Sequence, residues 1–460
     1  MMTVNNSKPK KIAIKMFPQE SHINAILAFA KELKELGNEV IFVGTSKISS
    51  IITENGLKFH EIPYDIVRLQ TYSKSTTKRK KNINDRLKTI KLFWNDRNHI
   101  KRIKNNIENE DFLTPIFQKL APDLVLIDMV YTIYIPPLIK SKMKFAIVQT
   151  TTSGVKTRTT LPLSSYFIPD IKSKTSEFLV QYEWFKHKLR HKIEDFMYGG
   201  SLESSIIKYL KKNNLVDQAG IDYERNRLVG FKKIPEINTT FLEFDFPHEK
   251  RYNHYYVAKP VLEKRNNLLY DFSYEQLLRE KKEQNKKIVF CSFGTAVFRY
   301  KNNEVIYESI IEVFKQLDYC VLYICIEDDN LRNELRENVQ GYDIHIFKRL
   351  PQIELLKSGV DIMIGHGGMN SINECILTCT PMLIYPGSRD MDQVGNSSKV
   401  FYHGLGLRGK YFDSKKKIIS QIEELLSNGK YKHNLSKMYN AINNSHNYLS
   451  AQEVLEELYK

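Results

Sequence analysis

The chain has 460 residues, 42% of them hydrophobic, and its formal net charge is +16. This length exceeds what a single hydrophobic core usually supports, so we expect two domains. The basic charge would suit nucleic-acid binding, but no nucleic-acid-binding signature accompanies it, and we therefore expect no specific nucleic acid as a partner.

The chain begins with the pattern of a βαβ unit. Residues 12–17 form a short apolar run that indicates a strand, and apolar residues then recur at helical spacing over 23–36. Ser21 is the expected N-cap of that helix, Gly37 ends it, and 40–44 is the next strand. This order is typical of a doubly wound parallel sheet. The first turn lacks a G-x-G-x-x-G pattern, so we expect no ordinary dinucleotide site there.

The sequence also favours a particular compartment. The apolar run at 12–17 is too short for a signal peptide, and no uninterrupted run of about twenty apolar residues occurs, so we expect no membrane span. The five cysteines lie in the second half of the chain and include no C-x-x-C pair, which argues against a zinc site and suggests a reducing compartment. We therefore expect a cytoplasmic protein.

Two candidate catalytic residues follow strands of the first half. His22 lies in the turn after the first strand, and Asp128 stands at the end of the apolar run 124–127. Ligands of doubly wound sheets bind beyond the carboxyl ends of the strands, so both side chains are expected on one rim, where contact between them is allowed. Spacing alone is equally compatible with a cap or turn role for each residue.

The stretch 66–104 is strongly basic and includes the run at 78–81. Such a stretch indicates solvated helices or a surface loop. It would also suit an anionic acceptor or peripheral contact with a membrane surface, and we keep both as hypotheses. Further along, 175–212 is expected to be mostly helical.

The densest pattern of polar residues lies in the second half. The run 360–364 indicates a largely buried strand, His366-Gly367-Gly368 follow at once, and a helix is expected from Met369. Glycines allow close approach of the backbone, and a helix N-terminus offers unpaired N–H groups, so this corner suits a phosphate. Glu374, one turn further on, could reach a ribose hydroxyl. Gly-Gly is also a common turn between a strand and a helix, so the pair alone is weak evidence.

A second strand at 382–385 leads to a loop with Asp392-Gln393, and Asn396 is expected to start the next helix. An adjacent carboxylate and amide suit vicinal sugar hydroxyls, although Asp-Gln before a helix is often only a cap.

Taken in order, these residues resemble the signature of the family 1 glycosyltransferases, the UDP-glycosyltransferase superfamily. The shared positions are Pro351-Gln352, His366, Gly367-Gly368, Asn370-Ser371, Glu374, Pro381, Pro386, Asp392-Gln393 and Asn396. The resemblance is densest over 292–406 and thins out in the N-terminal half. It implies an α/β fold of two facing Rossmann-like domains, the glycosyltransferase B architecture. The expected parts are an acceptor domain at 1–250, a linker at 251–285, a nucleotide-sugar domain at 286–440 and a C-terminal helix at 441–460 that packs back on the first domain.

The resemblance also implies roles for individual residues. His22 would be the general base and Asp128 would orient it. The donor residues are Gly294, Thr295, His366, Gly367, Gly368, Asn370 and Ser371 for the diphosphate, Arg349, Gln352 and Glu374 for the nucleoside, and Asp392 and Gln393 for the sugar. Arg349 stands where the family often has a stacking aromatic residue, which leaves the choice between uridine and thymidine open.

The reaction so implied is the inverting transfer of a hexose from a UDP-sugar or dTDP-sugar to a hydroxyl of a small hydrophobic acceptor, such as a phenol, macrolide, other natural product or lipid. No cofactor and no metal would be needed, although Asp390-x-Asp392 formally matches a metal-binding pattern. The protein would be a monomer or dimer. The alternatives are a catalytically silent nucleotide-binding homologue or activator, a sugar-nucleotide epimerase, and a cell-wall-lipid glycosyltransferase of the same fold.

Overall fold

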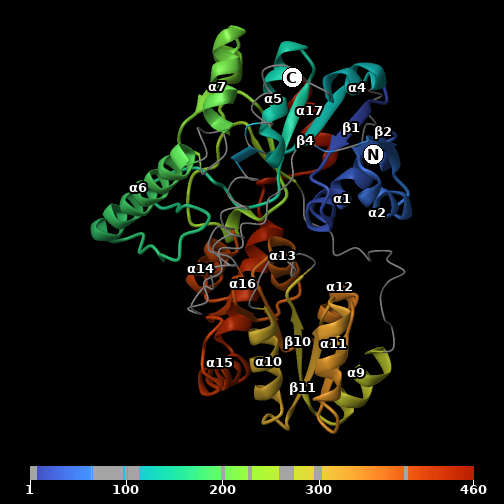
Figure 1. The fold of residues 1–460 in the computed structure, drawn as a ribbon, viewed down its shortest axis with the longest axis vertical. Coiled ribbons are helices and arrows are strands. Elements are labelled where there is room, and N and C mark those ends of the chain that lie inside the picture. The colour runs from blue at the N-terminus through green and yellow to red at the C-terminus, as the bar shows by residue number, and fades with distance from the viewer. Residues whose placement is uncertain are drawn as a thin grey trace.

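The computed structural model describes residues 8–63, 65, 97–98, 101, 113–197, 202–225, 230–257, 274–294, 303–387 and 392–460. Two parallel sheets form the centres of two domains that face each other along the long axis of the molecule (Figure 1). The predicted basic stretch at 66–104 lies almost wholly outside the described residues, and so does Thr295.

The first sheet has eight parallel strands in the order β16-β9-β8-β5-β4-β1-β2-β3. The elements of this domain are β1 (Lys11–Lys15), α1 (Glu20–Glu35), β2 (Glu39–Gly44), η1 (Ser46–Ile48), α2 (Ser49–Glu54), β3 (Lys58–Glu61), α4 (Leu113–Leu120), β4 (Leu124–Asp128), η2 (Met129–Tyr134), α5 (Ile135–Lys140), β5 (Phe145–Gln149), α6 (Lys174–Met197), α7 (Leu202–Lys212), α8 (Val216–Ala219), β6 (Ile221–Asp222), β7 (Gly230–Phe231), β8 (Glu236–Asn238), η3 (Leu242–Phe244) and β9 (His254–Val257). The strands β6 and β7 form a separate antiparallel pair.

The second sheet has six parallel strands in the order β12-β11-β10-β13-β14-β15. Its elements are α9 (Tyr274–Glu283), β10 (Lys287–Ser292), α10 (Asn303–Phe314), β11 (Cys320–Cys325), α11 (Asp329–Glu337), β12 (Ile344–Phe347), α12 (Gln352–Lys357), β13 (Ile362–Gly365), α13 (Met369–Leu377), β14 (Met382–Ile384), α14 (Gln393–Tyr402), β15 (Gly406–Arg408), α15 (Lys415–Ser427) and α16 (Lys430–Asn444).

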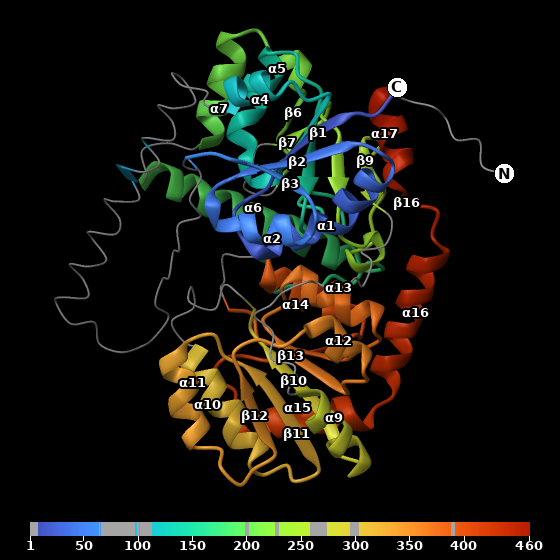
Figure 2. The same cartoon turned by 90° about the vertical axis from the view of Figure 1, so that its right-hand side faces the viewer.

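The end of the chain returns to the first sheet. After α16, the short strand β16 (Tyr448–Leu449) pairs with β9, and α17 (Ala451–Tyr459) packs beside α1 (Figure 2). Ala451 and Val454 are fully buried in the same apolar cluster as β1 and α1. Each sheet has a separate apolar cluster on each face, as the near-continuous apolar strands of a parallel sheet require.

Two predicted helix starts are wrong. Helix α1 begins at Glu20 with Gln19 at the N-cap, so Ser21 lies inside the first turn and caps nothing. The backbone N–H of Gln19 already turns back to the carbonyl of Phe17 at 2.7 Å, which starts the helix earlier than the apolar spacing indicates. Helix α14 begins at Gln393, and Asn396 donates its backbone N–H to the carbonyl of Asp392 at 2.8 Å. The helix predicted from Met369 is confirmed.

Among the described residues, no helix combines the length and the apolar character needed to cross a bilayer.

Candidate functional site

His22 and Asp128 meet at the carboxyl edge of the first sheet. His22 stands in the first turn of α1 and Asp128 is the last residue of β4, the strand next to β1. The distance from His22 Nδ1 to Asp128 Oδ2 is 2.7 Å. Asp128 is fully buried, whereas the His22 side chain is 17% exposed. The pairing that the sheet topology allowed is thus present in the structure.

Backbone groups hold the carboxylate of Asp128 in place. Its Oδ2 accepts the N–H of Phe17 at 3.1 Å, and its Oδ1 accepts the N–H of Val130 at 3.0 Å. Because a carboxylate only accepts, the ring nitrogen that faces it must carry a proton, and in a neutral imidazole the lone pair then lies on Nε2. The site therefore presets the tautomer in which Nε2 can take up a proton.

A buried charged cluster lies directly behind this pair. Lys15, at the end of β1, is fully buried and places its Nζ 2.6 Å from Asp65 Oδ2 and 3.0 Å from the hydroxyl of Tyr131. The Tyr131 hydroxyl also donates to Asp65. Burial lowers the pKa of Lys15, and the charge of Asp65 opposes that shift. The sequence analysis missed this cluster, although a lone lysine inside the apolar run 12–17 was a visible signal.

The second domain contributes a corner of backbone at the carboxyl ends of β10 and β13. Gly367 has φ +85°, and an added Cβ would lie 2.9 Å from Ile384 Cγ2, so the position requires glycine. Gly294 has φ +70°, and its Cβ would lie 2.8 Å from His366 Cε1. The two loops therefore touch at His366, directly before the N-terminus of α13, whose N-cap is Gly368.

His366 differs from a surface histidine in its charge. It is partly buried and stacks on Phe293, and desolvation lowers its pKa to about 4. Near neutral pH its imidazole is therefore uncharged, so any positive potential at this corner comes from the N–H groups and dipole of α13 rather than from His366.

Two of the residues predicted for the nucleoside, Gln352 and Glu374, form a hydrogen-bonded cluster with Ser371, which was predicted for the diphosphate. Gln352 Nε2 donates to Glu374 Oε2 at 2.6 Å and to Ser371 Oγ at 3.1 Å. Glu374 lies on α13 and is buried, while Gln352 is the first residue of α12. The two helices thus present a carboxylate, an amide and a hydroxyl at one place.

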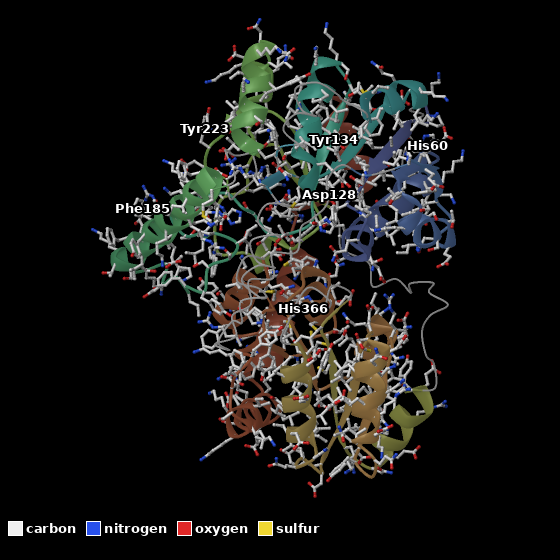
Figure 3. The ribbon with its side chains drawn as sticks, in the orientation of Figure 1. His60, Asp128, Tyr134, Phe185, Tyr223 and His366 are labelled. Carbon is white, nitrogen blue, oxygen red and sulfur yellow. The ribbon has the colours of Figure 1, made fainter. Side chains whose placement is uncertain are left out.

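The second domain, which is predicted to bind the donor, contacts the turn that carries His22. Asn370 Nδ2 donates to the carbonyl of Ser21 at 2.9 Å, and Arg349 Nη1 lies 3.1 Å from Glu20 Oε2. The other end of the Arg349 guanidinium lies 2.7 Å from Glu327 Oε1. Both contacts join residues beside His22 to residues predicted to bind the donor, so the two predicted half-sites meet (Figure 3, where Asp128 and His366 mark the two sides).

The predicted sugar residues also lie at this junction. Asp392 Oδ2 accepts the hydroxyl of Thr151 at 2.9 Å, and Gln393 Oε1 accepts the N–H of Gly387 at 3.1 Å. Asn396, which the sequence assigned only a helix start, donates to the carbonyl of Gly367 at 2.9 Å and to Asp392 at 3.2 Å. It therefore joins the loop predicted to bind the sugar to the loop predicted to bind the diphosphate.

Within the described ranges, no three His, Cys, Asp or Glu residues are grouped so that they could hold a metal ion; Asp390 falls in the gap at 388–391.

Several known proteins share this fold. The glycotransferase of kitacinnamycin aligns with a TM-score of 0.66 at 15% identity, over 98% of this chain and 99% of that one. The glycosyltransferase VinC, solved in complex with dTDP, aligns with a TM-score of 0.59 at 13% identity, over 98% of both chains. These similarities confirm the predicted fold of two facing Rossmann-like domains.

Relatives found by sequence match this chain over different lengths. The uncharacterized UDP-glucosyltransferase YojK of Bacillus subtilis (strain 168) is 22% identical over 421 residues, 90% of this chain and 89% of that protein. The zeaxanthin glucosyltransferase of Pantoea ananas is 30% identical over 101 residues, 22% of this chain and 23% of that protein. The match to YdhE of Bacillus subtilis (strain 168) covers 44% of its length. The chain thus spans less than half the length of these last two relatives.

A family-level match covers almost the whole chain. Residues 13–444 match the family described as UDP-glucoronosyl and UDP-glucosyl transferase. The matched range includes the second sheet, the first sheet except β16 and the first two residues of β1, the His22–Asp128 pair and every described residue predicted for the donor. The chain therefore belongs to the UDP-glucoronosyl and UDP-glucosyl transferase family.

Proposed function

We propose that this protein transfers a hexose from a UDP-sugar or dTDP-sugar to a hydroxyl of a small hydrophobic acceptor, with inversion at the anomeric carbon. One observation carries the proposal: His22 lies 2.7 Å from the buried Asp128, on a helical turn whose neighbouring residues are bonded to Arg349 and Asn370 of the donor domain. A base and a donor corner held together in this way are what a direct displacement needs.

The pair would act by proton transfer. Nε2 of His22 takes the proton of the acceptor hydroxyl while its oxygen attacks the anomeric carbon and the bond from that carbon to the diphosphate oxygen breaks. Asp128 stabilises the imidazolium that forms, as the carboxylate does in a hydrolase triad. Attack from the face opposite the leaving group inverts the configuration. General-base catalysis of this kind contributes about 10²–10⁴ in rate.

The donor domain would stabilise the leaving nucleoside diphosphate. Its negative charge would lie against the backbone N–H groups and dipole of the α13 N-terminus, beside Gly367 and Gly368. Glu374 and Gln352 would hold the ribose, and Asp392 with Gln393 the hexose hydroxyls. Arg349 would lie beside the base, with its guanidinium oriented by Glu20 and Glu327.

The relatives support the substrate classes. The curated relatives are described as UDP-glucosyltransferases, and VinC binds dTDP in its solved structure, so both nucleotides are candidates. Zeaxanthin, kitacinnamycin and spinosyn appear in the names of similar proteins, which favours an apolar natural-product acceptor.

The test uses Asp128→Asn in the full chain, with UDP-glucose and dTDP-glucose offered to a panel of phenols and macrolides. We expect kcat to fall by about 10²–10⁴ while the donor Kd stays within twofold, because the variant removes the charge behind His22 and leaves the donor corner intact. Asp123→Asn is the matched control, since Asp123 also accepts a backbone N–H but lies at the opposite end of β4.

Proton NMR of the product reports the anomeric configuration. Inversion agrees with the proposal. Retention, or an Asp128→Asn variant as active as the wild type, contradicts it.

A further inference from the structure

The long helix α6 contacts the first domain along one of its faces. Its buried residues are Ser176, Val180 and Trp184, and no residue of the helix beyond Trp184 is buried. Trp184 anchors the helix because its indole N–H donates to the carbonyl of Thr160 at 2.8 Å and its ring joins an apolar cluster that includes Phe246. Beyond Trp184 the helix still contacts the domain, because Lys188 Nζ donates to the carbonyl of Tyr223 at 3.4 Å, and α6 projects from the side of the domain in Figure 1.

One face of α6 carries a continuous row of exposed apolar side chains, here called the α6 stripe. Its members are Phe178, Tyr182, Phe185, Leu189, Ile193 and Phe196. Their spacings of three and four residues keep them within an arc of about 80°, at about 100° per residue. Phe185 is 61% exposed and Phe196 is 88% exposed, and Phe185 projects from α6 in Figure 3. Soluble proteins rarely expose such a contiguous apolar row without a use for it.

Basic side chains border the α6 stripe on both sides. On the same helical projection, Lys186 lies along one edge and Lys174 and Lys192 along the other, and all three are exposed. The acidic residues of the helix lie more than about 100° from the centre of the stripe. Three of them are engaged in ion pairs: Glu194 with Arg190 at 3.2 Å, Glu177 with Arg158 at 3.6 Å, and Glu183 with Lys186.

This distribution of charge identifies the partner. Lysines beside an apolar row can bury their carbon chains and extend their ammonium groups to anionic headgroups. A second copy of α6 would bring the same lysine edges together, which like charges oppose. The net charge of +16 on the whole chain adds a general attraction to an anionic surface.

The geometry points to α6 as a peripheral membrane-docking helix, which lies on an anionic lipid bilayer with the α6 stripe in the interface and Lys186 and Lys192 at the headgroups. The sequence had placed membrane contact in the basic stretch 66–104, whereas the described residues place it on α6. This inference concerns a surface apart from His22 and Asp128, and it does not depend on the proposed transfer.

The experiment is co-sedimentation of the full-length protein with vesicles of phosphatidylcholine alone or with about one third phosphatidylglycerol. We expect binding to the anionic vesicles, weaker binding to the neutral ones, and a loss of binding as salt rises from about 0.1 to 1 M, which shortens the Debye length from about 10 to about 3 Å. The variant Phe185→Ser/Phe196→Ser should lower the vesicle affinity by at least about tenfold, because two ring side chains no longer enter the interface. Lys186→Gln/Lys192→Gln should lower it only for the anionic vesicles.

Matched controls lie on the other domain. Phe412 is 66% exposed, and Lys416 and Lys437 are exposed, so Phe412→Ser and Lys416→Gln/Lys437→Gln remove the same groups at a distance from α6. Circular dichroism shows whether each variant is folded. Controls that bind like the wild type support the inference. No binding of the wild type to anionic vesicles, equal binding by the stripe variant, or a dimer in sedimentation velocity that only the stripe variant dissociates, would overturn it.

Discussion

The two halves of the candidate site differ in how their residues are brought together. In the second domain, the residues from Arg349 to Gln393 come from one continuous run of strand, loop and helix, and Gly367 has a positive φ that shapes the backbone of the predicted donor site. In the first domain, His22 and Asp128 are 106 residues apart, and only the adjacency of β1 and β4 joins them.

Each half of the site is therefore sensitive to a different kind of substitution. The donor half depends on local backbone geometry, so a single added methyl group can disturb it. The His22 half depends on side chains that lie in front of a buried charged cluster, and removal of Lys15 takes away the cation that pairs with the buried Asp65 carboxylate. Variants of the two halves should therefore differ in their effects on the free energy of unfolding and on donor affinity.

The largest expected effect is on the buried cluster. Lys15→Met removes the cation between Asp65 and Tyr131 and should lower the free energy of unfolding by about 3–5 kcal/mol, because it leaves the Asp65 carboxylate buried without its partner. Urea unfolding measures the change. Lys58→Met is the control, since it breaks an ion pair of the same 2.6 Å length with Glu39 that is exposed, and should cost less than about 1 kcal/mol. Equal effects of both variants would show that Lys15 is not an energetic centre of this domain.

The second-largest expected effect is a decrease in the free energy of unfolding at acid pH. Burial lowers the pKa of His366 to about 4, below about 6.5 in the unfolded chain, so the unfolded state binds the extra proton as pH falls. The free energy of unfolding should therefore decrease between pH 6.5 and 4 by up to about 3 kcal/mol, and this contribution should be constant above pH 6.5.

His254 supplies the comparison in the first domain, because burial also lowers its pKa to about 4, against the opposing charge of Glu236. Hydrogen exchange at several pH values resolves the two domains. His366→Gln should flatten the pH dependence in the second domain and His254→Gln in the first. A profile that neither substitution changes would contradict the assignment.

The smallest expected effect separates backbone strain from site geometry. Gly367→Ala and Gly341→Ala both place a side chain at positive φ, +85° and +83°, and each should cost about 1–2 kcal/mol of stability. Only Gly367→Ala brings a Cβ within 2.9 Å of Ile384, while the site of Gly341 is open. Calorimetry with UDP and dTDP should show weaker donor binding for Gly367→Ala alone. If the two variants bound the donor equally well, Gly367 would not be part of the donor-binding site.

Site residues that are close together in the sequence were easier to predict than those brought together from distant positions. The strand, turn and helix around His366 were predictable because consecutive residues there encode both the local structure and the chemistry. The rim position of His22 and Asp128 was also predictable, since parallel strands place their carboxyl ends together.

Sequence reasoning missed contacts between residues that lie far apart along the chain. The contacts of Arg349 with Glu20 and of Asn370 with Ser21 join residues 329 and 349 positions apart, and no local pattern signals them. Asn396 was expected to start a helix, whereas it lies inside α14 and its amide donates to the carbonyl of Gly367. Ser21 was expected at an N-cap because its hydroxyl suits that position, whereas it lies in the first turn of α1.

The central claim is that His22 takes the acceptor proton in a site whose donor half functions without it. The most direct measurement is the single-turnover rate of His22→Ala with a saturating nucleotide sugar, together with its donor Kd by calorimetry, beside an exposed-histidine control, His433→Ala. We predict that the rate falls by about 10²–10⁴ while the donor Kd and the control remain at wild-type values. A His22→Ala variant that transfers sugar at the wild-type rate would contradict the account.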